Sequence, residues 1–368
     1  MGNPIRILHV VVNMNRGGAE TLIMNLYRNI DRSKFQFDFL TCKEGVFDPE
    51  IIEMGGIIHR IPYVTDVGHS TYIKALDHFF MSHLEYQIVH SHMDKMSGFV
   101  LRSAKSAGIP VRIAHSHSTK NEGGLATKVY KWYAGRLILP FATHLFACSR
   151  NAAQWLFMKK NDQAIILKNG IECDHFSFSA EVRSRVREEL RLKQDDFVVG
   201  HVGRFCHPKN HSFLLGIFAE FEKVYPNAML ILAGDGPLRL DIEKRAESLN
   251  LGNRVQFLGV RSDIHRLLQA FDVFVFPSIY EGVPVTLIEA QGSGLPCVIS
   301  DVITTEVDMG IQLIEYTSLL DPKLWVEKIK HTAARNVPRQ LSAERISQNG
   351  YDIKNTSHWI QAFYLQSR

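Results

Sequence analysis

The stretch "VFVFPSIYEGVPVTLIEAQGSGLPCVIS", residues 273–300, begins and ends with short runs of apolar and β-branched residues. Such runs are typical of buried strands. Between them, Pro284 suits the first turn of a helix, and Gly292 or Gly294 is expected to end it. A strand, a helix and a second strand in this order predict two parallel strands joined by a crossover helix.

The same alternation continues in both directions along the chain. Segments 19–30 and 211–226 show the apolar spacing of helices, and similar segments separate the other strands. The predicted strands form two series, 5–12, 35–42, 87–92, 111–117, 143–149 and 164–170, then 197–203, 228–234, 254–260, 273–278 and 296–300. The chain is therefore predicted to be an α/β protein with two doubly wound, mostly parallel sheets.

A charged, weakly apolar segment at 179–197 divides the two series. We place the linker near residues 172–178, which gives an N-terminal domain of residues 1–174 and a second domain beginning at 175. A length of 368 residues suits two domains better than one core. Ligands of doubly wound sheets bind beyond the carboxyl ends of the strands. Two such domains are expected to face each other across a central cleft.

Composition excludes several classes of protein. With 45% hydrophobic and 22% charged residues, the chain is an ordinary globular protein. The five cysteines occur singly, which argues against a zinc ribbon or a disulfide framework and suits a reducing cytoplasm. The start lacks the pattern of a signal peptide, and the most apolar segment, 137–148, is too short to span a bilayer. A cytoplasmic protein is expected.

A glycine motif follows the first strand of the first series, and a basic motif follows the first strand of the second series. Gly17 and Gly18 precede a helix, where backbone N–H groups can approach a phosphate or carboxylate, although a tight turn alone also explains them. Arg204 and Lys209 lie in a short loop before another helix. A guanidinium and an ammonium placed there suit a diphosphate, whereas the alternative is a solvated basic loop.

Histidines end two strands of the first series, in "VHSH" (89–92) and "IAHSHST" (113–119). Alternate residues of a strand share one face, so each pair points the same way. The pairs are candidate metal ligands, with Asp94 as the nearest carboxylate, or simply structural histidines. A third interpretation makes one of them a hydrogen-bond donor to a ligand, and His117 is best placed for this at the strand mouth.

Two glutamates occupy the opening stretch. Glu281 is expected in the loop before the helix, and Glu289 inside it. Glu289 shares a helical face with Val285 and Ile288, so its carboxylate is costly there unless it is paired or bound to a ligand. Vicinal hydroxyls, as in a ribose, would meet that need.

In this order and spacing, the motifs resemble the retaining glycosyltransferases of the GT-B architecture, specifically family 4. The resemblance runs along most of the chain and rests on "GGAE" (17–20), "AHSHST" (114–119), "GRFCHPKN" (203–210), "LAGDGP" (232–237) and the two glutamates of "EGVPVTLIEAQGSGLP" (281–296). It implies two Rossmann-like domains: an acceptor domain (1–174) and a nucleotide-sugar domain (175–350). It also implies that a C-terminal helix, 351–368, crosses back to the first domain.

The resemblance also implies roles for individual residues. Arg204 and Lys209 would hold the donor diphosphate, Glu289 the ribose and Glu281 the sugar hydroxyls, with backbone amides of Gly282 and Val283 reaching sugar or phosphate. Gly17 and Gly18 would line the cleft, and His117 would lie near the transferred sugar. The catalytic set expected on this basis is His117, Arg204, Lys209 and Glu281. No Asp-x-Asp motif occurs, in agreement with a family that needs no metal or other cofactor.

The expected reaction is transfer of a hexosyl group from a nucleotide-diphosphate sugar, preferably a UDP-sugar, with retention of configuration. The acceptor is expected to be a saccharide or lipid-linked saccharide in cell-surface polysaccharide assembly. Alternatives are a nucleotide-sugar 2-epimerase of the same fold, a metal-dependent hydrolase using the histidine pairs, and a catalytically silent binder. Nucleic acid is not an expected partner.

One departure from the family pattern concerns "SDVITTEVDMGIQL" (300–313), which lacks a Gly-Gly pair that many relatives carry. Glu306 is the acidic residue nearest to that place, and we assign it no role.

The segment 111–140 combines cations with aromatic and apolar residues and includes only one acid, Glu122. Residues 1–175 carry 20 Lys and Arg against 15 Asp and Glu, a charge of +5, whereas residues 176–368 carry 22 against 23, or −1. Peripheral contact of this segment with the inner face of an anionic membrane is therefore one expectation. An amphipathic helix packed on its own sheet is the other.

Overall fold

A computed structural model describes residues 3–120, 123–334, 339 and 343–367. The chain forms two compact units, residues 1–170 with 350–368, and residues 171–349. The division thus falls at Gly170, slightly before the predicted linker, and the C-terminal segment belongs to the first unit. Glu122 lies outside the described residues.

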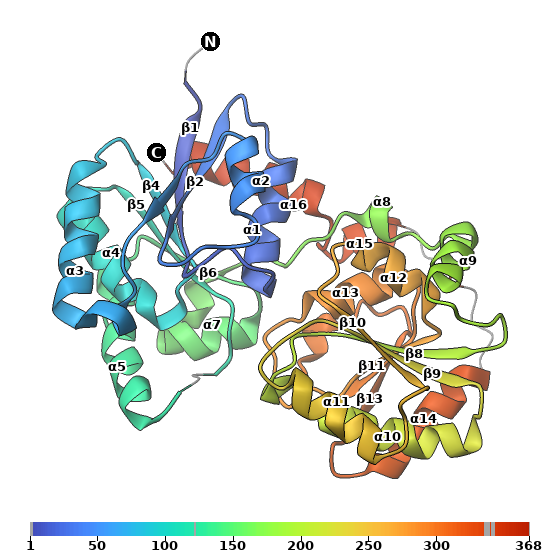
Figure 1. Cartoon of the computed structure of the whole chain (residues 1–368). Helices are drawn as coiled ribbons and strands as arrows, with labels where there is room; N and C mark the ends of the chain where they lie inside the picture. Colours follow the sequence, from blue (N-terminus) through green and yellow to red (C-terminus); the bar gives the residue numbers. More distant parts are fainter. Residues whose placement is uncertain (1–2, 121–122, 335–338, 340–342, 368) are drawn as a thin grey trace. The chain divides into compact units, whose positions relative to one another are not determined.

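The first unit contains a seven-stranded parallel sheet in the order β3-β2-β1-β4-β5-β6-β7 (Figure 1). Its strands are long apolar runs because both faces of the sheet are covered, and every residue of Phe35–Thr41 is buried. The strands are β1 (Ile5–Val10), β2 (Phe35–Thr41), β3 (Ile58–Arg60), β4 (Ile88–Ser91), β5 (Val111–Ser116), β6 (His144–Ala147) and β7 (Ile165–Ile166).

Helices cover both faces of this sheet (Figure 1). On one face, phenylalanines of β2 pack with α1 and with Tyr364 of the C-terminal helix α16; on the other, Leu8 and Leu40 pack with α3 and α4. The helices of this unit are α1 (Gly18–Asn29), α2 (Asp48–Glu53), α3 (Val64–Ser82), α4 (Ser97–Ser106), α5 (Leu125–Gly135), α6 (Ile138–Phe141), α7 (Arg150–Phe157) and α16 (Ile353–Gln366).

The second unit contains a six-stranded parallel sheet in the order β10-β9-β8-β11-β12-β13 (Figure 1). Its strands are β8 (Phe197–Val202), β9 (Ala228–Ala233), β10 (Val255–Gly259), β11 (Val273–Phe276), β12 (Cys297–Ser300) and β13 (Ile314–Thr317). Its helices are α8 (Cys173–Phe176), α9 (Ala180–Glu189), α10 (His211–Val224), α11 (Arg239–Ser248), α12 (Ile264–Ala270), α13 (Val285–Gly292), α14 (Pro322–Ala334) and α15 (Ala343–Gln348). One core joins β8, β9 and β11 to α10 and to Trp325 of α14.

Both sheets place their first strand centrally and reverse the direction of strand succession beside it. In the first unit this happens between β1 and β4, and in the second between β8 and β11. Loops leaving such a pair of strands diverge to opposite faces and leave a crevice at the carboxyl ends, the usual ligand position. A ligand is therefore expected at each of the two reversal points.

Each predicted strand contains an observed one, although the prediction 164–170 forms only over Ile165–Ile166. The βαβ unit of residues 273–300 is β11-α13-β12, with Cys297 paired to Phe274 in parallel register. Pro284 caps α13, which ends at Gly292. Two short strands were not predicted, β3 and β13, and both are edge strands. Among the described residues, no helix is long and apolar enough to cross a membrane.

Candidate active site

The loop after β8 is held by backbone contacts from the neighbouring strand β9. Phe205 donates its N–H to the carbonyl of Asp235 at 3.0 Å. Gly234 has a φ of +139°, and a Cβ there would lie 2.0 Å from the carbonyl oxygen of Gly203. Glycine is thus required for the two loops to meet. This explains the "LAGDGP" motif, which positions the β8 loop.

On its other side, the same loop is tied to the end of β11. Ile279 donates its N–H to the carbonyl of Pro208 at 2.8 Å, and the Asn210 side chain donates to the carbonyl of Pro277 at 3.2 Å. Asn210 has a left-handed φ of 56° and is the N-cap residue of α10. The loops of the reversal pair β8 and β11 are therefore fixed to each other.

This tie brings two predicted site residues into direct contact. Lys209 Nζ lies 2.7 Å from Glu281 Oε1, and the two side chains are only 17% and 16% exposed. The ammonium also lies 4.6 Å from the ring centroid of Phe276. A partly desolvated pair costs solvation energy, which the short contact and the aromatic face offset. It forms a fixed charge centre at the strand ends.

Arg204 leaves the same loop but is exposed. Gly282 is partly exposed and Val283 is buried, so the turn after Glu281 packs one side against the unit. The structure thus brings Lys209 and Glu281 together and leaves Arg204 exposed to solvent.

Glu289 lies inside α13, as predicted, with Val285 and Ile288 buried beside it. The residue retains some surface exposure, yet burial of its carboxyl group raises the pKa to about 7. Among the described residues, no hydrogen bond or ion pair reaches this carboxyl. An acid kept in such surroundings is a candidate ligand-binding group.

The predicted glycines of the first unit lie at the start of α1, next to the end of β1. Neither has a left-handed φ; Gly17 is extended, and a Cβ on it would meet the Glu20 carboxylate at 2.3 Å. A Cβ on Gly18 would have no described atom within 4 Å. Burial raises the pKa of Glu20 to about 7, a shift that the sequence argument missed.

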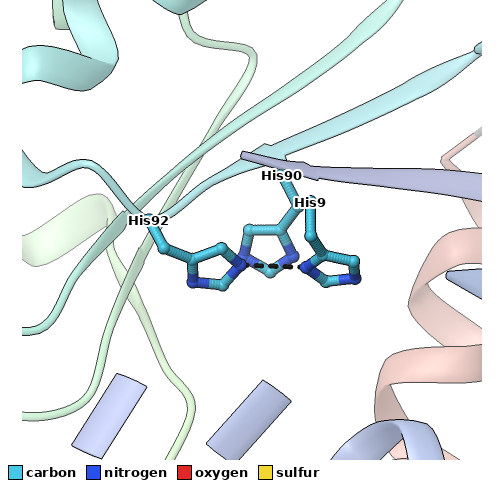
Figure 2. Close-up of side chains that lie close together, drawn as sticks. All are labelled: His9, His90 and His92. Atoms are coloured by element: carbon cyan, nitrogen blue, oxygen red, sulfur yellow. Dashed lines mark hydrogen bonds between the residues drawn. The ribbon is translucent and has the colours of Figure 1, made fainter. Parts of the chain in front are cut away.

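Five histidines gather at the reversal point of this sheet. Their strand positions face one another because His9 of β1 is in register with His90 of β4, and alternate residues share a face. Figure 2 shows three of them, with a dashed line from His9 Nδ1 to His92 Nε2, which are 3.0 Å apart. The set is His9, His90, His92, His115 and His117.

These imidazoles form two hydrogen-bonded chains. His92 Nδ1 lies 2.8 Å from His117 Nε2, so the first chain runs from His9 through His92 to His117. In the second, His90 Nδ1 contacts the Tyr364 hydroxyl at 2.8 Å, and His90 Nε2 contacts His115 Nδ1 at 3.0 Å. The chains stack, with 4.3 Å between the ring centroids of His90 and His92.

Burial keeps the imidazoles neutral. It lowers the pKa of His9 and of His117 to about 3, and burial followed by repulsion between neighbouring imidazoles lowers the pKa of the other three well below its usual value. The backbone N–H of His117 donates to Asp94 Oδ1 at 3.1 Å, and burial raises the pKa of that carboxyl to about 6. Two trios, His9, His90 and His92, and His92, His115 and His117, have ring nitrogens within 4.8 Å of one another.

Sequence reasoning missed His9, which lies in a strand without a second histidine two residues away. Nothing in the local pattern connects it to His92. It becomes visible only when β1 is placed beside β4.

Both halves of the chain match known families. Residues 16–175 match the family described as Glycosyltransferase Family 4, and residues 182–350 match Glycosyl transferases group 1. The putative glycosyltransferase EpsF of Bacillus subtilis (strain 168) is 41% identical over 95% of this chain and 93% of its own. The chain belongs to the family 4 glycosyltransferases.

A second relative gives the same result. This glycosyltransferase is 31% identical, over 98% of its chain and 97% of the other, to the UDP-Gal:alpha-D-GlcNAc-diphosphoundecaprenol alpha-1,3-galactosyltransferase of Escherichia coli. In structure, it resembles Anabaena HepE in complex with UDP and glucose, with a TM-score of 0.82, 21% identity and coverage of 99% and 100%. The predicted GT-B fold and family are thus confirmed, and the chain is an enzyme of glycosyl transfer.

Proposed function

We propose that this glycosyltransferase moves a hexosyl group from a nucleotide-diphosphate sugar, with UDP favoured, to a saccharide or lipid-linked saccharide, retaining the anomeric configuration. The observation that carries the proposal is the Lys209–Glu281 pair at the reversal point of the second unit. A cation for phosphate and a carboxylate for hydroxyl groups lie there side by side. A role in bacterial polysaccharide assembly is supported by a third relative, the capsular polysaccharide biosynthesis glycosyltransferase CapH of Staphylococcus aureus, which is 26% identical over 98% of this chain and 99% of its own.

The chemistry requires stabilisation of a departing diphosphate. As the bond to the anomeric carbon breaks, negative charge develops on the leaving phosphate oxygen. The ammonium of Lys209 is already fixed by Glu281, so little reorganisation is needed to meet that charge. The exposed guanidinium of Arg204 is free to form a bidentate contact with the phosphates. We propose that these two cations act in place of a metal ion.

The remaining site residues are proposed to orient the donor. Glu281 would hold hydroxyls of the sugar, with the backbone of Gly282 and Val283 beside it. Glu289 would accept hydrogen bonds from the ribose hydroxyls, which suits a carboxyl that lacks a partner among the described residues.

In the first unit, Gly17 and Gly18 would let a ligand approach the first N–H groups of α1. His117 would contact the transferred sugar. We assign no covalent nucleophile; attack from the face that the nucleotide leaves accounts for retention.

The proposal is tested by incubating the protein with a panel of UDP- and GDP-sugars and measuring nucleotide release. We expect release from at least one UDP-hexose in the absence of added metal, and an anomeric configuration by NMR that equals the donor's. An inverted product would remove the retaining mechanism. Release that requires a divalent metal, abolished by a chelator, would remove the roles given to Lys209 and Arg204.

A surface on α5 supports a membrane-bound acceptor. Leu125, Val129 and Trp132 lie at helical spacing on one face and are 81%, 57% and 55% exposed. The cations Lys128 and Arg136 are exposed nearby, and the Arg136 guanidinium lies 5.1 Å from the Trp132 ring centroid. Exposed apolar groups beside cations match the interface of an anionic bilayer. We propose that this face contacts the membrane that carries a lipid-linked acceptor.

Co-sedimentation with vesicles tests this contact. We expect binding to vesicles of phosphatidylglycerol and phosphatidylcholine, weakening with salt, and little binding to phosphatidylcholine alone. Trp132→Ser should reduce binding, whereas Leu240→Ser, an exposed leucine of α11 in the second unit, should not. Equal binding by both variants would contradict the assignment to α5.

A further inference from the structure

The chain of imidazoles His9–His92–His117 is unpartnered at both ends. His117 Nδ1 and His9 Nε2 are buried nitrogens without a hydrogen-bond partner among the described residues. His92, between them, uses both ring nitrogens, at 3.0 Å to His9 and 2.8 Å to His117. The chain therefore connects the interior of the sheet to the residue at the mouth of β5.

Neutral imidazole imposes a direction on such a chain. Each ring carries one N–H and one bare nitrogen, so every ring donates once and accepts once. If His92 donates from Nδ1 to His117 Nε2, then His9 must donate to His92, and His117 carries its proton on Nδ1. If the chain runs the other way, His9 carries its proton on Nε2. Either direction leaves one N–H without an acceptor at one end.

The surroundings of the two ends decide the direction. His9 is fully buried, and its ring centroid lies 4.2 Å from that of Phe37. An N–H left without an acceptor there would cost more than a bare nitrogen. Nδ1 of His117 is buried as well, but the residue is partly exposed at the end of β5, so an N–H there lies nearer to a possible acceptor than an N–H on His9 would. The lower-energy arrangement has the bare nitrogen on His9 and the N–H on His117 Nδ1.

We propose that His92 and His9 are positioning residues that hold His117 as its Nδ1–H tautomer, so that a neutral imidazole donates a hydrogen bond to a hydroxyl oxygen of the transferred sugar. The contact with the sugar rests on the proposed function, whereas the tautomer of His117 depends only on its neighbours within the protein. Burial, which lowers the pKa of His117 to about 3, is consistent with a donor that stays uncharged at neutral pH.

Metal coordination explains the contacts less well. A tetrahedral zinc ion with bonds of about 2.0–2.1 Å holds two imidazole nitrogens about 3.3 Å apart. The contacts of 2.8 and 3.0 Å are shorter and fit N–H···N hydrogen bonds. In addition, His90 of the first trio already uses both nitrogens, on Tyr364 and His115. Metal binding is therefore an outcome that the test must detect.

The neighbouring chain Tyr364–His90–His115 provides a matched control. It stacks on the first chain, with the His115 and His117 ring centroids 4.0 Å apart, but no hydrogen bond connects the two chains among the described residues. Tyr364→Phe removes a hydroxyl from this second chain and leaves His9, His92 and His117 intact.

The decisive measurement is the tautomer of His117 by nitrogen-15 NMR of the unliganded full chain with labelled histidine, assigned with His117→Gln. We expect the proton on Nδ1 in wild type and in Tyr364→Phe. His92→Phe, which keeps an aromatic ring but removes both nitrogens, should allow mixed tautomers. His92→Gln, whose amide both donates and accepts, should largely preserve the wild-type signal. The same samples are analysed for bound zinc and nickel.

Kinetics supplies the second measurement. His92→Phe should lower kcat in proportion to the fraction of His117 that lacks its Nδ1 proton, about twofold for an even mixture of tautomers, and His92→Gln should recover most of this loss. The inference is overturned if wild-type His117 is protonated on Nε2, if its tautomer is unchanged in His92→Phe, or if stoichiometric metal occupies the histidines. The expected tautomer without any glycosyl transfer would instead overturn only the proposed function.

Discussion

The two sheets have the same strand arrangement at their reversal points but different electrostatics there. In both, a central strand and its reversal partner lie side by side in parallel, so their carboxyl ends are neighbours. Beside β8 and β11 the chain places a Lys209–Glu281 ion pair. Beside β1 and β4 it places uncharged imidazoles bonded to one another.

The difference teaches that strand order decides where a site lies but not which ligand it suits. A fixed cation at one reversal point is matched to the permanent charge of a diphosphate. Neutral donors and acceptors at the other reversal point suit hydroxyl groups, because a contact with a hydroxyl would not offset the cost of desolvating a charge. The predictions below test this contrast.

The largest expected difference between the two units is how much stability each loses at low pH. A buried histidine whose folded pKa lies below its unfolded value of about 6.5 binds fewer protons when folded, so stability is retained above that pH and lost as pH falls below it. The first unit has five such histidines, opposed by Asp94 and Glu20, whose raised pKa values have the reverse effect. The second has His201 and His211, opposed by Glu289.

Because the first unit holds more of these buried histidines than the second, it should lose stability more steeply as the pH falls below about 6, by about 1.4 kcal/mol per pH unit for each additional imidazole held neutral. Hydrogen exchange with mass spectrometry at pH 7.5 and 5.5 should show the first unit opening in acid. If the second unit opens first, the imidazoles are not held neutral.

The next largest effect is expected from Lys209→Ala. Removing a preorganised cation from the leaving group should lower kcat by about 100- to 1,000-fold, with a smaller change in KM. Lys223→Ala is the matched control, since Lys223 also pairs with a glutamate at 2.7 Å, but both side chains are more than 60% exposed. It should leave kcat unchanged and stability within about 1 kcal/mol. Similar losses in both variants would mean that Lys209 acts only through folding.

The smallest effect concerns the pH dependence of nucleotide binding. The Glu289 carboxyl has a pKa of about 7, and under the proposed function ribose hydroxyls would donate to its ionised form. UDP affinity should therefore rise up to about tenfold from pH 6 to pH 8 in wild type, measured by calorimetry. Glu289→Gln should bind more weakly than wild type at pH 8, with a flat profile over this range. An unchanged pH profile in the variant would remove Glu289 from the ribose site.

Sequence patterns predicted the strands that are covered on both faces, because buried parallel strands are continuous apolar runs. They missed Ile58–Arg60 and Ile314–Thr317, two short edge strands whose residues are mostly partly exposed. The roles of the motifs were predicted unevenly. "LAGDGP" gave no chemical signal, yet Gly234 is what allows the loop that carries Lys209 to take its place.

The sequence by itself determined the two doubly wound sheets, the family, and the residue types available at the strand ends, since all of these depend on local periodicity and short motifs. Only the tertiary structure decided that Lys209 pairs with Glu281, 72 residues away, and that His9 lies 3.0 Å from His92, 83 residues away. The physical reason is that a strand's neighbours are set by packing of the whole sheet. Pairing, burial and protonation follow from those neighbours.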